Sequence, residues 1–597
     1  MAGPAMLFSA IKQKTDMQRH IQKINKSHTF RPFQLYILLG LLFLFSCKTS
    51  KKWEQSHLEP IDPRSIKNDA NTKNLKKVNI LPHLQELELP EEDARMLEQF
   101  YELNQNRLAW FNNNRLSRNV NQLLQNLGMA WTEGLPVERY QTGLIYEDIR
   151  QLKTLSEGGA VYPGLYAHLD IMLTHIYFQY AKDLHTGTIN PQLLGKGWEG
   201  GLQPVDYPQV LHDALRRHRV EKSLEALKPQ RSSYDVLSEN LERLIEVRDE
   251  GGWEEPGHFE TLRPGDSSPN VVRLKKFLSK TGDLRIKDST YLQDLSFDRT
   301  LEMAVRSFQR RHGLKPDGIP GEKTLEQMNR SIGYRIGQIK ANLERMRWVP
   351  EHEEHYVLVN IPEFILRYYR NNKPINQMKV VVGKDTHHTP ILSDTIRYVV
   401  FNPTWNVPPS IVREEMVHRM KSDSTYLERN QFMLFRGSYV SGDMVNPDSV
   451  NWKNITAENF PYFVVQEPGS HNSLGRVKFL FPNEQNIYLH DTPAQHRFSA
   501  YSRDFSHGCV RIEKPIAFAS QLLKGQMTMA EINDILESKE TTTITLHDRP
   551  VVYFIYQTAW VDQDGELNFR EDLYDFDRIT LDKFAERKKS EIPSFAF

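Results

Sequence analysis

The segment 487–511 gathers the side chains best suited to chemistry in this sequence. It contains a thiol, two imidazoles and a guanidinium, contributed by Cys509, His490, His507 and Arg511. Only the thiolate is nucleophilic, and a free thiol with a pKa of ~8.5 needs a neighbouring base or positive charge to ionise at neutral pH. The segment therefore predicts nucleophilic catalysis by Cys509.

His490 is the predicted general base. It ends an apolar run typical of a strand, so an adjacent strand can bring its imidazole to the sulfur of Cys509. Tyr488 lies two residues earlier on the same strand, faces the same side and can supply a hydroxyl. His507 shares the face of Cys509 only if the segment between them is extended.

The neighbours of the cysteine suggest how a developing negative charge is held. Gly508 has no Cβ to crowd the approach and lets the backbone present amides, that of Cys509 among them, to an oxyanion. Arg511 can bind a substrate carboxylate through its guanidinium fork, or it can brace a loop at the surface. Asp491 and Asp504 can each orient an imidazole or cap a loop.

A β-rich domain over residues 352–557 has to position these groups. Its apolar period is two, and residues 356–361 and 365–369 form a predicted hairpin. A Pro- and Trp-containing, helix-prone stretch at 403–475 interrupts the strands and has the size of an inserted capping lid. Further strands are expected at 378–382, 396–401, 462–466, 477–481, 487–489, 542–546 and 551–556.

The regions on either side of the β-rich domain have other patterns. Residues 76–260 have helical periodicity and predict a helical scaffold. Residues 261–330 predict three short helices around one small core, and residues 331–351 a helical linker. Residues 558–597 are charged and are expected to form a peripheral C-terminal tail.

The first 47 residues have the layout of a bacterial secretory signal with a lipobox. A basic lead precedes a 13-residue run, 33–45, that is apolar apart from one residue, and Cys47 follows as the predicted lipidation site. An uncleaved signal anchor is the alternative. Residues 48–75 read as a flexible tether. Both readings place the body outside the cytosol, on the periplasmic face of a bacterial envelope membrane.

Composition excludes several classes of protein. The 597 residues include 76 Lys and Arg and 76 Asp and Glu, so no net charge favours nucleic acid as a partner. One apolar run near the start excludes a polytopic membrane protein. No His or Cys pair has zinc-ligand spacing, and the adjacent pair His387 and His388 is typical of a solvated loop. No metal site and no cofactor are predicted.

Two motifs resemble known families. His490 followed by Ser506-His507-Gly508-Cys509 resembles the signature of L,D-transpeptidases with a YkuD-type catalytic domain, and the stretches 402–410 and 487–493 resemble its large, multidomain YcbB-like branch. The stretch 304–325 is similar to the peptidoglycan-binding domain family. Many smaller members have Asn at the position of Arg511, and the YcbB-like branch often has Ser at that of His507.

The resemblance implies a multidomain α+β fold and a cysteine acyltransferase that forms 3→3 cross-links in peptidoglycan. Cys509 would be acylated by a tetrapeptide stem with loss of D-Ala, and His490 would move the protons. The resemblance implies that four residues support the reaction or the oxyanion: Gly508, His507, Ser506 and Tyr488. It implies that Arg511 and Trp405 bind the substrate.

The resemblance also implies partners and leaves alternatives. Carbapenems are expected covalent inhibitors, and peptidoglycan stem peptides and glycan are the expected binding partners. If water replaces the acceptor amine, the same site is an L,D-carboxypeptidase. A lipid-anchored, wall-binding scaffold without catalysis is the alternative from a different class.

Overall fold

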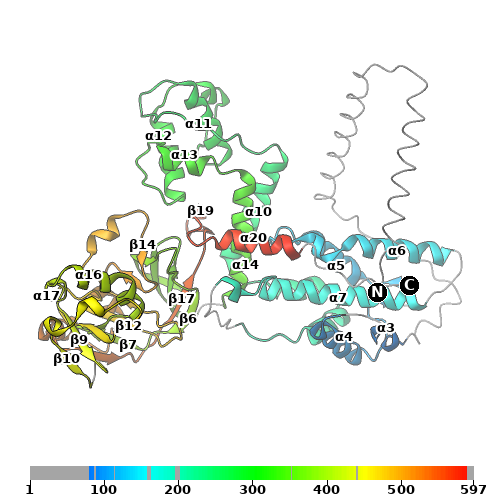
Figure 1. Cartoon of the computed structure of the whole chain (residues 1–597). Helices are drawn as coiled ribbons and strands as arrows, with labels where there is room; N and C mark the ends of the chain where they lie inside the picture. The colour runs from blue at the N-terminus through cyan, green and yellow to red at the C-terminus, as the bar shows by residue number, and fades with distance from the viewer. Residues whose placement is uncertain are drawn as a thin grey trace, which may run out of the picture. The chain divides into compact units, whose positions relative to one another are not determined.

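Figure 1 presents the computed structural model of the chain. It describes residues 79–85, 89–112, 115–157, 163–194, 202–350, 353–438 and 441–587. The predicted lipidation site Cys47 and the tether 48–75 lie outside these ranges and stay predictions. Within them, every helix is too short or too polar to cross a bilayer.

The first described region is helical, as the sequence predicts. Its longest helix, α7, is buried along most of its length because apolar residues occupy nearly all of its faces. Asp170 on α7 is satisfied by the hydroxyl of Tyr101 and by the amides of Ala109 and Trp110. The elements are α3 (Leu81–Gln85), α4 (Glu91–Leu103), β1 (Phe111–Asn112), β2 (Arg115–Leu116), α5 (Arg118–Gly128), η3 (Val137–Tyr140), α6 (Thr142–Glu157), α7 (Pro163–Thr186), η4 (Pro191–Leu194), α8 (Tyr207–Arg217), α9 (Val220–Glu225) and α10 (Ser232–Asp249).

A small module of three helices follows, and Figure 1 shows α11, α12 and α13 gathered together. Ser268 and Asp298 accept hydrogen bonds from the first-turn amides of α11 and α12, which fixes where each helix begins. Val271, Leu274 and Phe308 are among the residues of its own apolar core. The elements are α11 (Pro269–Lys280), η5 (Ser289–Gln293), α12 (Arg299–Arg311) and α13 (Glu322–Met328).

The predicted helical linker is a buried helix, α14 (Ile332–Trp348). Its Glu344 accepts hydrogen bonds from the amides of Thr188 and Ile189, which follow α7. Arg347, one turn later, donates to the hydroxyl of Tyr234 on α10 at 2.7 Å. These charged groups are fully buried and paired, and they join α14 to the segment after α7 and to α10.

An eleven-stranded sheet forms the β-rich domain. The long strand β5 pairs with β4 along most of its length and with β15 and β14 near its end, so it connects the two halves of the sheet. Helices α18 (Pro515–Leu522) and α19 (Met529–Ser538) complete the core. The strands are β3 (His355–Asn360), β4 (Ile365–Arg370), β5 (Lys373–Gly383), β6 (Leu392–Thr395), β7 (Tyr398–Phe401), β12 (Val477–Leu480), β13 (Leu489–His490), β14 (Asp504–Ser506), β15 (Val510–Ile512), β16 (Thr542–Thr545) and β17 (Val551–Ile555).

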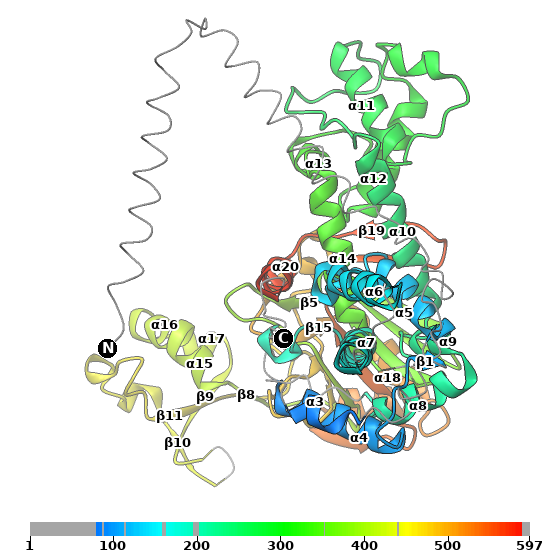
Figure 2. The ribbon, with the colours of Figure 1, turned by 90° about the vertical axis from the view of Figure 1, so that its right-hand side faces the viewer.

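The insert between β7 and β12 folds as a unit of its own. It has a four-stranded sheet in the order β10-β9-β11-β8 and a separate core that includes Val412, Leu434 and Val464. Figure 2 shows its helices α15 to α17 beside these strands. The elements are β8 (Trp405–Asn406), α15 (Pro409–Ile411), η6 (Val412–Met416), α16 (Val417–Ser422), α17 (Tyr426–Arg429), β9 (Phe432–Arg436), β10 (Asp443–Val445), η7 (Pro447–Ser449), η8 (Trp452–Asn454) and β11 (Tyr462–Gln466). The multidomain α+β fold is confirmed, and the insert is present with its own core, while its role as a capping lid stays a prediction.

The expectation of a peripheral C-terminal tail is wrong for the described residues 558–587. They form the hairpin β18 (Ala559–Val561) and β19 (Leu567–Phe569) and the helix α20 (Phe576–Arg587). The reason is that buried apolar side chains, Phe569 and Phe584 among them, are interspersed among the charged residues of this segment. Asp577 on α20 pairs with the buried Arg345 of α14 and accepts a hydrogen bond from Thr558 at 2.7 Å.

We expect Asp577→Ala to lower the free energy of unfolding by about 3–5 kcal/mol, because Arg345 then stays buried without its partner charge. Denaturant unfolding followed by fluorescence measures the loss. Asp582→Ala is the matched control, since Asp582 lies on the same helix in an exposed pair with Arg578. Its effect should stay below about 1 kcal/mol. Equal effects of the two substitutions would contradict a structural role for the C-terminal segment.

Candidate active site

The sheet register brings the predicted residues to one face. His490 on β13 lies opposite Lys478 on β12 and opposite Arg511 on β15. Leu489 and Val510, one residue away, pair with each other and are fully buried on the other face. Since side chains alternate along a strand, Tyr488 and Cys509 lie on the same face as His490 and Arg511.

Cys509 is partly exposed and is the free thiol of the described residues. Its Sγ lies 3.8 Å from the carbonyl oxygen of Asn486. Burial raises the pKa of the Cys509 thiol, while hydrogen bonds from Tyr488 and the charges of Lys478 and Arg511 act in the opposite direction. The burial effect prevails, so the resting sulfur is a protonated thiol at neutral pH.

His490 is buried and held in one tautomer. Its Nδ1 lies 2.6 Å from the carbonyl oxygen of Asp491, which can only accept, so Nδ1 carries the proton and Nε2 is free to act as a base. Burial, with Arg511 and Lys478 nearby, lowers the pKa of His490 to about 3. The imidazole is therefore neutral at pH 7 and able to accept a proton.

The carboxylate of Asp491 does not orient the imidazole. It accepts hydrogen bonds from the amides of Arg476 at 2.8 Å and Thr492 at 2.7 Å, and it therefore caps the loop. The backbone carbonyl of Asp491 orients the ring of His490 instead. Of the two roles that the sequence left open for this residue, the structure supports the loop cap.

The turn before the cysteine depends on Gly508, whose φ of +111° suits glycine. The amide of Gly508 donates to the Oγ of Ser506 at 3.1 Å, and Thr389 donates to the carbonyl of Gly508 at 2.7 Å. The Gly508 amide is thus engaged inside the turn. The amide of Cys509 makes no hydrogen bond to another described residue, so it is the better oxyanion donor of the two.

The two predicted substrate-binding residues flank the cysteine. Trp405, on β8 of the insert, and Cys509 both act on the pKa of the Tyr488 hydroxyl, Trp405 lowering it and Cys509 raising it. Arg511 is half-buried, and its Nε has no hydrogen-bond partner among the described residues. Burial and the charge of Arg497 lower the pKa of Arg511. A guanidinium in this situation suits a carboxylate brought by a ligand.

His507 points to the insert. Its Nε2 lies 2.8 Å from the Oε1 of Glu415, which belongs to η6. Burial lowers the pKa of His507, although Glu415 acts in the opposite direction. The resemblance implies that His507 is a supporting residue and His490 the base, and both roles stay predictions.

Sequence reasoning missed three residues of this site. Lys478 faces the sulfur from β12, Thr389 fixes the turn, and Glu415 reaches it from the insert. Alternation along 477–481 was a usable signal for Lys478, because it puts this residue on the face opposite the core. Nothing in the sequence pointed to Thr389 or Glu415, which lie far from the cysteine in the chain.

Family models match three parts of the chain. Residues 354–532 match the L,D-transpeptidase catalytic domain, described as YkuD. Residues 95–241 match a model described as a scaffold domain. Residues 267–328 match the model named "Putative peptidoglycan binding domain".

Two curated proteins are similar to parts of the chain. A Haemophilus influenzae protein named "Putative L,D-transpeptidase" is 35% identical over 242 residues, which are 40% of this chain and 48% of that protein. The chain thus matches about half the length of this relative. The N-acetylmuramoyl-L-alanine amidase CwlM of Mycobacterium tuberculosis is 36% identical over 83 residues, 13% of this chain and 20% of the amidase.

Two solved structures are also similar. An L,D-transpeptidase fragment from Xylanimonas cellulosilytica is 14% identical and covers 50% of this chain and 100% of its own, with a TM-score of 0.16. An L,D-transpeptidase from Stackebrandtia nassauensis is 14% identical and covers 49% of this chain and 94% of its own, with a TM-score of 0.18.

We expect the buried neutral imidazole of His490 to make stability pH-dependent. The folded-state pKa of about 3 lies below the ordinary value of ~6.5, so between these values only the unfolded chain binds the proton. Stability is therefore complete above pH ~6.5 and falls towards pH 3, by up to ~1.4 kcal/mol per pH unit. Denaturant unfolding at several pH values from 7 to 4 measures this slope.

The matched variants are His490→Gln, which removes the titrating group, and His547→Gln, which removes an exposed histidine. The first should flatten the pH dependence of stability, and the second should leave it unchanged. An identical slope in all three proteins would show that His490 is not a buried neutral base.

Proposed function

We propose that this multidomain chain cross-links peptidoglycan by 3→3 transpeptidation through a thioester on Cys509. Its residues 354–532 match the L,D-transpeptidase catalytic domain. The observation that carries the proposal is the single sheet face on which the thiol of Cys509 and the neutral imidazole of His490 both lie. Residues 267–328, with their match to a peptidoglycan-binding family, support the cell wall as the partner.

In the first half-reaction, the Sγ of Cys509 attacks the carbonyl carbon between the third-position diamino acid and the terminal D-Ala of a tetrapeptide stem. The Nε2 of His490 takes the thiol proton, so a tetrahedral oxyanion forms beside the Cys509 amide. The C–N bond then breaks, D-Ala leaves with the proton returned by the imidazolium, and a thioester stays on Cys509.

The electrostatics favour proton transfer during attack over a preformed thiolate–imidazolium pair. The thiol pKa is raised and the imidazole pKa is lowered, so both groups start neutral. Lys478 and Arg511 stabilise the negative charge once it develops on the sulfur. The two cations therefore stabilise the transition state more than the neutral ground state, which increases the rate.

In the second half-reaction, the side-chain amine of another stem attacks the thioester carbonyl and loses a proton to His490. The C–S bond breaks, the thiolate regains that proton, and a 3→3 peptide bond is left. Water in place of the amine would give the L,D-carboxypeptidase product. The insert supports transfer over hydrolysis, because its Trp405 acts on Tyr488 beside the thiol, and an insert held in this position would exclude water.

The test incubates the purified protein with disaccharide tetrapeptides and identifies products by mass spectrometry. We expect loss of D-Ala together with 3→3 dimers. Cys509→Ala should lower turnover by about 10³-fold or more, since the nucleophile is removed. His490→Gln should lower it by about 10²–10⁴-fold through loss of the base.

Two controls make this assay decisive. His547→Gln changes an exposed histidine and should keep full turnover. Sedimentation with sacculi should be unchanged in Cys509→Ala, because that measurement reports only wall binding. D-Ala loss without dimers would favour carboxypeptidation, and sedimentation without any turnover in the unmodified chain would favour a non-catalytic scaffold.

We also expect carbapenems to acylate Cys509. The β-lactam carbonyl carbon would bond to Sγ, the ring C–N bond would break, and the ring nitrogen would take the thiol proton. Lys478→Met should slow this reaction, because the negative charge that develops on the sulfur during attack loses a nearby cation. Intact-mass kinetics with peptide mapping measures it. An adduct on another residue, or an unchanged rate in Lys478→Met, would contradict the assignment.

A further inference from the structure

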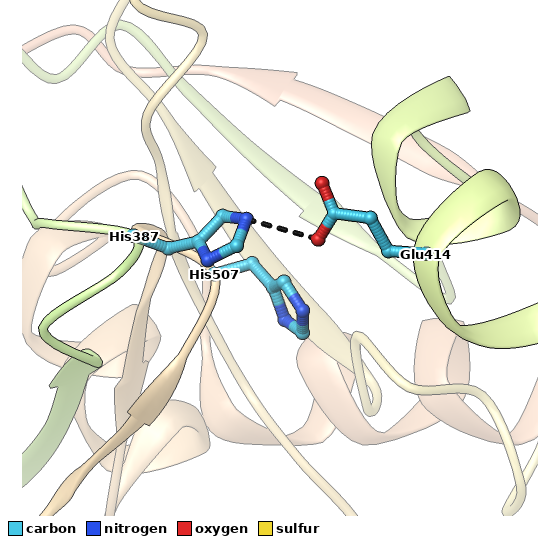
Figure 3. Close-up of side chains that lie close together, drawn as sticks. All are labelled: His387, Glu414 and His507. Atoms are coloured by element: carbon cyan, nitrogen blue, oxygen red, sulfur yellow. Dashed lines mark ion pairs between the residues drawn. The ribbon is translucent and has the colours of Figure 1, made fainter.

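A second cluster of reactive side chains lies beside the turn that carries Cys509. His387 belongs to the loop between β5 and β6, His507 to the turn before the cysteine, and Glu414 to η6 of the insert (Figure 3). One ligand atom from each lies within 4.8 Å of the other two. The Nε2 of His387 is 3.2 Å from the Oε2 of Glu414, and the two imidazole rings are 4.9 Å apart.

We propose that His387, Glu414 and His507 bind a divalent transition-metal ion of the Zn²⁺ class. Two imidazoles and one carboxylate are a donor set of zinc sites that keep an open fourth position, whereas Mg²⁺ and Ca²⁺ prefer oxygen ligands only. Bonds of about 2.1 Å in a tetrahedron place ligand atoms about 3.4 Å apart. Small side-chain rotations from the present separations are enough to reach this geometry.

The surroundings of the cluster match what a metal site needs. The Nδ1 of His387 is 3.1 Å from the hydroxyl of Thr386, which orients the ring and leaves Nε2 directed at Glu414. Glu415, next to Glu414, lies 2.8 Å from His507 and can fill or support the fourth position.

The backbone that presents the two histidines is already fixed. Thr389 accepts a hydrogen bond from the amide of Gly383 at 2.8 Å and donates to the carbonyl of Gly508 at 2.7 Å. The loop of His387 is thereby joined to the turn of His507. The neighbouring His388 has a different role, because its ring stacks on Tyr574 at 4.1 Å. His388 is exposed in this loop, as the solvated-loop reading expects, whereas His387 is half-buried.

A bound ion would join the insert to the catalytic turn. Two ligands come from the β-rich domain and one from the insert, so the ion would fix their relative position two residues before Cys509. The site itself does not depend on the proposed function, because metal binding is measured without turnover. Any effect of the ion on the reaction at Cys509 rests on the proposed transpeptidase function.

The test uses the full chain with Cys47→Ser and Cys509→Ala, which removes both thiols as competing ligands. Titration calorimetry with ZnCl₂ should show one site per chain. His387→Ala, His507→Ala and Glu414→Gln in this background should each weaken zinc binding by at least about tenfold, since each removes one ligand. His418→Ala is the matched control, because His418 is exposed on α16 one turn after Glu414, and it should leave the affinity unchanged.

Crystals of the double variant soaked in ZnCl₂ give a second measurement that requires no change in the cluster. An anomalous zinc peak between His387, Glu414 and His507 is the expected result. The proposal is overturned if no peak appears there at full soak, or if the three ligand variants, shown folded by circular dichroism, bind zinc as tightly as the His418→Ala control.

Discussion

Parallel pairing of β13 with β15 is the interaction on which the candidate active site depends. It sets His490 opposite Arg511 and buries Leu489 against Val510 on the other face. A shift of one residue would turn every side chain of either strand to the opposite face. The apolar pair therefore holds the register, and the register holds the thiol and the imidazole on one surface. β5 supports this arrangement from the other edge of β15.

Desolvation determines the chemical state of the site. Burial raises the pKa of Cys509 and lowers that of His490, so each group is neutral at rest. Two cations on the same face, Lys478 and Arg511, add to the downward pKa shift of His490 and oppose the upward pKa shift of Cys509, so they disfavour an imidazolium and stabilise a thiolate. The same charges thus keep the base unprotonated before reaction and stabilise the sulfur as its proton leaves.

The insert adds a second level of organisation to this face. Trp405 reaches the hydroxyl of Tyr488 from one part of the insert, and Glu414 and Glu415 reach the two histidines from another. Because the insert has an apolar core of its own, it is a preformed body that meets the catalytic turn through a few polar contacts. Polar contacts of this kind respond to ligands and ions more readily than a continuous apolar core does.

The sequence by itself determined which residues carry the candidate chemistry, because thiol, imidazole and glycine lie close together in one motif with His490 not far upstream. It also determined the three-helix module and most strands of the sheet, since apolar periods of 3.6 and 2 are local properties. Only the tertiary structure decided that Lys478 faces the cysteine, that Asp491 caps a loop, that Glu414 meets His387, and that residues 558–587 are packed into the fold. Strand order and the docking of the insert come from packing between distant segments, and local sequence patterns do not record them.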